Sequence, residues 1–250
     1  MQRLLFGAIV PVTLVATWEW SARTGALTLE SLSRPSDILR AGYLGLHDGS
    51  LLLATGQTFE TALLGLAIAA LAGILCGAVL GLWPILDRVT SPTVEALRAI
   101  PAVALMPLAL MMFGFGVGLE ASIVTYACVW PILIVTISAV RSIEPRLLEV
   151  ADALQLSFPE RLVKIILPAA MARINVGLRV AAGISLVVAV TVEIVLNPRG
   201  LGYALILAQQ SLKTDVMYAQ LLWLCILGAA LNAVLRRFGG GQLVLWRPAR

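Results

Sequence analysis

The sequence predicts an all-α membrane protein with about six transmembrane helices. Of the 250 residues, 60% are hydrophobic and 13% are charged, and the mean hydropathy is +0.94. A soluble domain usually has roughly 25% charged residues, so this chain has too few to cover a soluble surface. Its apolar residues form six runs of about 20 residues, the length at which a helix crosses a lipid bilayer. We therefore expect lipid to be the solvent for much of the chain.

The first apolar run covers residues 4–20. Its length would suit a signal peptide, but no clean small-x-small cleavage site follows it. Trp18, Glu19 and Trp20 at its end are typical of a membrane interface. We expect an uncleaved first span. Residues 21–55 are polar and predict an extracytoplasmic loop that contains a turn and a short amphipathic helix.

Residues 59–86 predict a long second span with small residues on one face. Gly73, Gly77 and Gly81 recur every four residues, so they share one side of the helix and let another helix approach closely. The sequence leaves open whether that neighbour belongs to the same chain or to a second copy.

The third span is predicted to begin at Pro92 and to continue to about residue 113. Pro101 and Pro107 lie inside this run. A proline inside a helix removes a backbone hydrogen bond, so we expect kinks at both positions. Residues 120–139 follow as the fourth span.

A polar stretch after the fourth span predicts two short helices. Pro145 suits the first position of a helix, where its missing N–H is not needed, and this helix should end near Gln155 or Leu156. Ser157 and Glu160 have the spacing of a capping box, which starts a second helix that should end near Pro168. One face of the first helix is apolar and carries Leu147, Val150, Ala151 and Leu154.

Residues 176–196 and 216–235 predict the fifth and sixth spans. Glu193 lies three residues before the end of the fifth span, where a charged group is costly unless it reaches water or has a function. Two interpretations are equally open. Glu193 is either a residue of a solute pathway or gate, or an interfacial carboxylate in contact with water.

The basic residues predict the orientation. With the N-terminus inside, 13 of the 18 lysine and arginine residues lie on or next to the side that carries the polar stretch. Cytoplasmic loops carry the excess of Lys and Arg. We therefore expect a multi-pass protein of the cell inner membrane, with the polar stretch and both termini in the cytoplasm.

The sequence excludes several kinds of chemistry. Neither Lys164 nor Lys213 follows a glycine, so the phosphate-binding pattern G-x-x-x-x-G-K-[ST] is absent. His47 is the single histidine, and the three cysteines lie apart in apolar runs, so we expect no catalytic site and no metal site. The scattered arginines do not indicate nucleic acid binding. Energy must therefore come from a partner subunit or from ions.

Two motifs resemble those of permease subunits of ABC importers. The run LRAIPAVALMPLALMMFGFG is similar to the third span of the nitrate, sulfonate and taurine permeases, and the resemblance covers roughly residues 55–240. Val150 stands where these proteins usually have Ala. Gln155 stands where they usually have Gly, which removes a flexible turn residue. The spacing of their EAA loop is matched by Glu149, Ala151, Gln155, Ile165, Leu167 and Pro168.

The resemblance implies a type I ABC-importer permease fold with a cytoplasmic coupling helix. Its partners would be ABC ATPase subunits, a second permease copy forming a homodimer, and an extracytoplasmic substrate-binding protein. The ATPase would bind ATP and Mg, and this chain would hold no cofactor. The solute would be a small anion or organic molecule such as nitrate, a sulfonate or taurine. The residues implied in ATPase docking are Glu149, Val150, Ala151, Asp152, Gln155, Ser157, Leu167 and Pro168.

These observations divide the chain into three parts. Residues 1–55 form the N-terminal span and outer loop, residues 56–240 form a permease core with the coupling loop at 145–168, and residues 241–250 form a cytoplasmic tail. The alternative function is a stand-alone ion-coupled carrier or channel, which would need a network of carboxylates inside the membrane.

Overall fold

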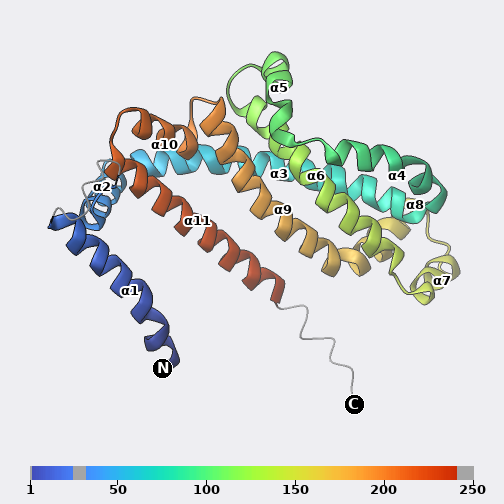
Figure 1. Ribbon diagram of the computed structural model, residues 1–250. Coiled ribbons are helices and arrows are strands. Elements are labelled where there is room, and N and C mark those ends of the chain that lie inside the picture. Colours follow the sequence, from blue (N-terminus) through green and yellow to red (C-terminus); the bar gives the residue numbers. More distant parts are fainter. Residues whose placement is uncertain (1, 25–31, 241–250) are drawn as a thin grey trace.

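The computed structural model describes residues 2–24 and 32–240, and within them it is all-α (Figure 1). The predicted tail at 241–250 lies outside the described residues. The helical elements, of which η1 is a 3₁₀ turn and η2 a π turn, are α1 (Gln2–Arg23), α2 (Pro35–His47), α3 (Ser50–Leu82), α4 (Pro84–Ala99), η1 (Ala102–Leu105), α5 (Met106–Phe113), α6 (Val117–Arg141), α7 (Pro145–Ala153), α8 (Phe158–Arg161), η2 (Leu162–Ile166), α9 (Leu167–Val195), α10 (Gly200–Gln210) and α11 (Thr214–Gly240).

Four segments of the described chain are long and apolar enough to cross a membrane. They are Ser50–Leu82, Val117–Arg141, Leu162–Val195 and Thr214–Leu235. A fifth crossing is present if α4 and the segment Ala102–Phe113 count as one span broken by an 83° bend. The predicted first span coincides with α1, whose 22 residues would extend about 33 Å. The prediction of an α-helical multi-pass membrane protein is confirmed.

The prediction for the third span is wrong in detail. The helix begins at Pro84 and not at Pro92, which lies inside α4. The chain then leaves the helix completely at Ile100, which has an extended backbone (φ −73°, ψ 123°). The residue before a proline is pushed away from the helical region, so Pro101 ends α4 instead of kinking it. Pro107 lies at the start of α5, where its missing N–H costs nothing.

The glycine face of α3 packs against α6 of the same chain, which answers the question that the sequence left open. A Cβ added at Gly77 would lie 2.7 Å from the Cβ of Thr136, and the other glycines of the face meet α6 equally closely. The facing pairs are Gly65 with Val124, Gly73 with Ile132, Gly77 with Thr136, and Gly81 with Val140. Each pair is 59 positions apart in sequence, as are Thr61 and Glu120, which also contact each other. A constant offset means that α3 and α6 run in the same direction.

The parallel pair fixes the two ends of the bundle. The thiol of Cys128 on α6 donates to the carbonyl of Ala181 (3.3 Å), and Gly177 faces Val135, so α9 runs antiparallel to α6. The stretch from Ser142 to Arg161 therefore lies where α3 and α6 end. Figure 1 shows α7 and α8 at this end of the bundle and α2 and α10 at the opposite end.

The α3–α6 packing predicts a large effect for a single methyl group. Gly77→Ala should lower the free energy of unfolding by about 1–3 kcal/mol, because the new Cβ also meets the backbone oxygen of Leu133 at 2.9 Å. The melting temperature of the purified protein in detergent measures this loss. Gly56→Ala is the matched control on the same helix, since nothing lies within 4 Å of its added Cβ, and alanine there should be neutral or stabilising. Equal losses at both positions would refute the close contact.

Candidate functional site

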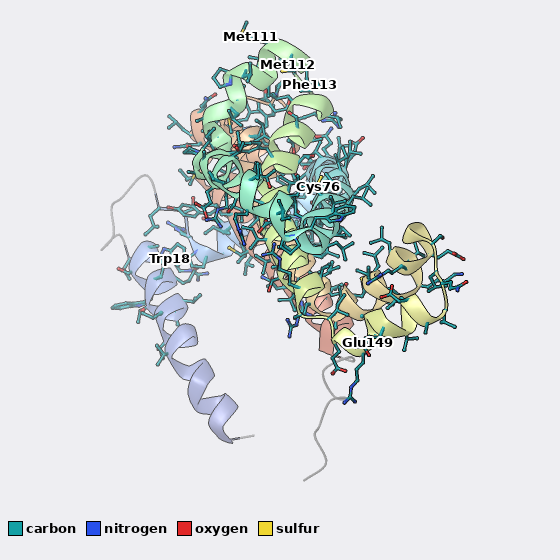
Figure 2. The ribbon with its side chains drawn as sticks, turned by 90° about the vertical axis from the view of Figure 1, so that its right-hand side faces the viewer. Trp18, Cys76, Met111, Met112, Phe113 and Glu149 are labelled. Atoms are coloured by element: carbon teal, nitrogen blue, oxygen red, sulfur yellow. The ribbon has the colours of Figure 1, made fainter. Side chains whose placement is uncertain are left out.

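The first helix of the polar stretch, α7, exposes most of its apolar face. Ala151 is buried (1% exposed), whereas Leu147, Val150 and Leu154 are 41%, 50% and 63% exposed. Apolar side chains that stay in contact with water cost free energy unless another surface covers them. Glu149 is exposed on the same helix, and Figure 2 shows it far from Met111 at the tip of α5. The apolar face of α7 is therefore a candidate docking surface.

The turn that ends α7 keeps the shape of a glycine turn although it contains no glycine. Gln155 has a φ of +49°, in the left-handed region. The backbone N–H of Gln155 donates to the carbonyl of Asp152 (3.0 Å), and that of Leu156 donates to the carbonyl of Ala151 (3.1 Å). These two bonds form a Schellman motif, whose left-handed residue is usually Gly. Gln155 therefore preserves the turn at a cost in backbone strain.

The second short helix, α8, begins at Phe158, as predicted, but its cap differs from a full capping box. The Glu160 carboxylate accepts the backbone N–H of Ser157 (3.1 Å), as the motif requires. The Ser157 hydroxyl donates to the same carboxylate (2.6 Å). Hydrogen bonds from Lys164 (2.8 Å) and Ser157 lower the pKa of Glu160 to about 2. Glu160 therefore stays ionised at any physiological pH.

The second helix does not end near Pro168, so that prediction is wrong, and α9 begins at Leu167 and not near residue 176. Pro168 lies in the first turn of α9, which follows α8 through the π turn η2 without leaving the helical region. Pro168 cannot donate a hydrogen bond to the residue four positions earlier. The wider turn just before it, in which the Leu167 N–H donates to the carbonyl of Leu162, accommodates this gap. The helical path is therefore continuous from Phe158 to Val195.

One ion pair joins the two short helices. Arg161 of α8 donates to the Asp152 carboxylate of α7 at 2.7 Å. Ile166, in the π turn η2 that follows α8, is fully buried in a cluster with Ala139, Ala170 and other residues of α3, α6 and α9. Of the remaining docking residues, Leu167 is half-buried and Ser157 and Pro168 are exposed. The predicted docking residues thus lie on one folded unit anchored in the bundle, and their role in docking stays a prediction.

Glu193 lies at the opposite end of the bundle and is buried (1% exposed). Its carboxylate accepts the backbone N–H of Gly202 (2.8 Å), in the first turn of α10. Gly200 has a φ of +88°, and any side chain at this position would overlap the Glu193 carboxylate. Glu193 therefore fixes α10 to α9 by satisfying a free N–H group at the helix start. Whether it also belongs to a pathway or gate stays a prediction.

A second buried carboxylate, Glu120, has a position that the sequence analysis missed. It is fully buried on α6, accepts a hydrogen bond from the Asn197 amide (2.7 Å), and contacts the hydroxyl of Thr61. Asn197 in turn accepts the N–H of Gly116 (3.0 Å). In the sequence, Glu120 is noticeable only as a carboxylate inside an apolar run. Its hydrogen-bond partners could not be identified there, because they lie 59 and 77 positions away.

A bundle of long apolar helices with an exposed helical loop at one end defines an integral membrane protein. Residues 69–240 match the family described as binding-protein-dependent transport system inner membrane component, and the chain belongs to this family. It is therefore a multi-pass inner-membrane permease of the ABC importer class, a transport component and not itself an enzyme. Membership in the family implies an ATPase and a substrate-binding protein as partners.

Individual relatives cover most of the chain. It is 28% identical to the taurine transport system permease protein TauC of Escherichia coli over 228 residues, which are 89% of this chain and 83% of that protein. It is 33% identical to the bicarbonate transport system permease protein CmpB of Synechococcus elongatus over 199 residues, 78% of this chain and 72% of that one. A chain of the MetNI methionine ABC transporter, in an inward facing conformation, has the same fold, with a TM-score of 0.61, 20% identity, and coverage of 76% of this chain and 92% of that chain.

The strained turn predicts that a glycine at position 155 would make the turn more stable. Gln155→Gly should stabilise the turn by up to about 1 kcal/mol, because glycine adopts the left-handed region without steric cost. Hydrogen exchange at the amides of Gln155 and Leu156 should then slow. Gln155→Ala removes the same side chain but keeps the strain, so it should give no gain. Faster exchange in the glycine variant than in the alanine variant would contradict this account of the turn.

The position of Glu193 predicts different results for two substitutions. Glu193→Ala leaves the N–H of Gly202 without an acceptor and should cost about 1–3 kcal/mol, measured as a lower melting temperature in detergent. Glu193→Gln keeps an acceptor oxygen and should cost less. Glu60→Ala is the control, since the ion pair of Glu60 with Arg199 is partly exposed and its loss should cost at most about 1 kcal/mol. A Glu193→Gln variant that is stable but inactive in transport would instead assign Glu193 to the pathway.

Proposed function

We propose that this permease imports a small anion or organic solute, such as nitrate, a sulfonate or taurine, and that it works as one of two identical copies. We propose further that residues 145–168 are the surface on which a separate ATPase subunit docks. The solute class is supported by the relatives whose names specify taurine and bicarbonate. The docking surface is supported by one observation above all, the exposed apolar face of α7.

The proposed coupling acts mainly through α9. Movement of an ATPase docked on α7 and α8 would reach the bundle along α8, η2 and α9, because this helical path is unbroken. The path into α6 is weaker, since residues 142–144 separate α6 from α7. ATP and Mg would be bound by the ATPase, and this chain's residues would only bind the ATPase and transmit its motion.

The proposed orientation puts the α7–α8 end in the cytoplasm, together with both termini. Its support is the charge of that end, which carries Arg88, Arg141, Arg146, Arg161 and Lys164. The extracytoplasmic binding protein would then approach the end formed by α2 and α10.

A second copy of the chain would cover the apolar tip of α5. Met111, Met112, Phe113 and Phe115 are all more than half exposed, and Figure 2 shows the first three at one extreme of the molecule. α5 contacts only η1 and α6 substantially among the described elements. In the proposed homodimer, this projecting apolar helix would lie between the two subunits.

The ion-coupled carrier is the second candidate, and one observation favours it. Glu120 and Glu193 are both buried carboxyl groups, the kind of residue that such a carrier needs. Both, however, accept hydrogen bonds that join elements at the proposed outer end of the bundle. Glu120 accepts from Asn197 in the connection between α9 and α10, and Glu193 accepts from Gly202 of α10. Transport by the purified chain without an ATPase, driven by an ion gradient alone, would establish this candidate.

The docking surface predicts selective loss of the ATPase. Leu154→Ser and Glu149→Lys should each reduce co-purification of the ATPase at least tenfold, while the permease still inserts in the membrane. Leu207→Ser is the matched control, because Leu207 is 47% exposed on α10 at the opposite end, and it should leave the complex intact. Full co-purification of both loop variants would refute docking at this surface.

A further inference from the structure

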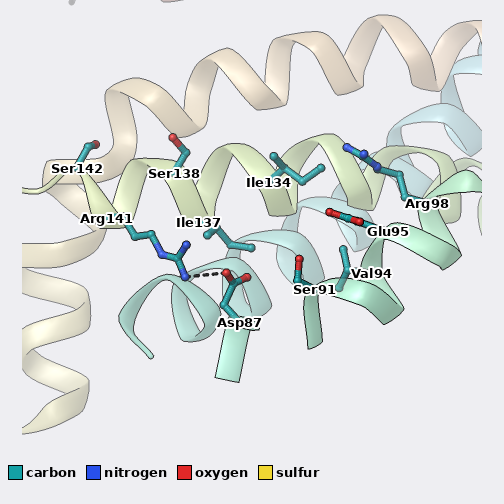
Figure 3. A pocket seen from close by; sticks show the side chains of 10 residues that line it. All are labelled: Asp87, Ser91, Val94, Glu95, Arg98, Ile134, Ile137, Ser138, Arg141 and Ser142. Carbon is teal, nitrogen blue, oxygen red and sulfur yellow. Dashed lines mark hydrogen bonds and ion pairs between the residues drawn. The ribbon is translucent and has the colours of Figure 1, made fainter. Parts of the chain in front are cut away.

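A cavity of about 490 Å³ lies between α4 and α6, outside the docking loop and the outer carboxylates (Figure 3). Its volume is in the range of small-molecule sites. The polar side chains that line it are Asp87, Ser91, Glu95, Arg98, Ser138, Arg141 and Ser142. The proposed function uses only the charge of Arg141 among them, for the orientation, and gives none of them a role in solute binding.

The cavity exists because α4 is held to α6 only at its two ends. Near one end Arg141 donates to the Asp87 carboxylate at 2.8 Å. At the other end the Tyr126 hydroxyl donates to the carbonyl of Leu97. No residue of α4 is buried, so between these contacts the two helices leave a polar space open.

The cavity offers one cation and one anion that are not already paired. Arg141 and Asp87 neutralise each other. Arg98 and Glu95 form no ion pair within the described part of the chain, and they lie three positions apart on the same side of α4. Figure 3 shows both side chains directed along the space between α4 and α6.

A second hollow continues from Arg98 along α6. It is lined by Tyr126, Trp130 and Pro101 as well as by Arg98. The rings of Tyr126 and Trp130 meet edge to face, with centroids 5.5 Å apart. From Arg141 to Tyr126 the two hollows follow about 22 Å of α6, starting at the end that carries the docking loop. The two hollows share Arg98 and Ile134 in their linings and together form a candidate solute path along this side of α6.

We propose that the cavity is a solute-binding subsite on this path and that it takes a small zwitterion. The acid group pairs with the Arg98 guanidinium, whose planar donors match the oxygens of a carboxylate or sulfonate. The amino group pairs with the Glu95 carboxylate. A simple anion fits less well, because Glu95 would stand unpaired beside it. The proposal rests on the proposed function and adds the charge type of the solute to it.

The test uses the purified full-length permease in detergent, with taurine as the zwitterionic probe and isethionate, in which a hydroxyl replaces the ammonium group, as the anionic probe. Saturation-transfer NMR titrations measure the two affinities. Taurine should bind at least tenfold more tightly than isethionate. Arg98→Gln and Glu95→Gln should each weaken taurine binding at least tenfold. Lys213→Gln, which removes an exposed cation at the opposite end of the bundle, should change it less than twofold.

Three outcomes would overturn the subsite. They are equal binding of the two probes, tighter isethionate than taurine binding, and no detectable taurine binding by the wild-type chain. Melting temperatures show whether the variants fold, and Arg98→Lys, which keeps the charge but loses the planar donors, should bind taurine with intermediate affinity. Co-purification of the ATPase with the wild-type chain is measured separately. Its failure would refute the proposed function, whereas intact co-purification without taurine binding would refute the subsite alone.

Discussion

The close packing of α3 against α6 is the contact on which the rest of the structure depends. Four glycines bring the two backbones together at a constant offset, and dispersion contacts of this kind hold helices together in lipid, where the hydrophobic effect gives no driving force between them. Because the two helices are parallel, the chain between them must return across the bundle. The broken path through α4, η1 and α5 makes that return. α9 then crosses the bundle antiparallel to α6, so the α7–α8 loop and α10 lie at opposite ends.

The sequence predicted what depends on local chemistry. The glycine face, the start of α7 at Pro145 and the start of α8 after Ser157 all follow from residues within one or two helical turns. The third span was predicted less well, because whether a proline kinks a helix or ends it depends on the backbone of the preceding residue. Ile100 takes the extended conformation that ends α4. The error at Pro168 was the opposite one. This proline was expected to end a helix, but the π turn η2 before it lets the helix continue.

Contacts between distant segments could not be predicted in this way. Glu120 meets Asn197 across 77 positions, and no periodicity in the sequence connects them. The pairing of Arg141 with Asp87, across 54 positions, is of the same kind. Gln155 is an intermediate case. Its place in the motif was recognised, but only the backbone angle shows that a glutamine has kept the conformation of the residue it replaces.

The π turn between α8 and α9 has a consequence for the direction in which the loop faces. A π turn contains one residue more than an α turn, and one residue corresponds to a rotation of about 100° around the helix axis. η2 therefore sets the direction, around the axis of α9, in which α8 and α7 project from the end of this helix. A deletion of one residue within η2 would swing the whole loop around this axis while every lipid-facing and core-facing side chain of α9 kept its place.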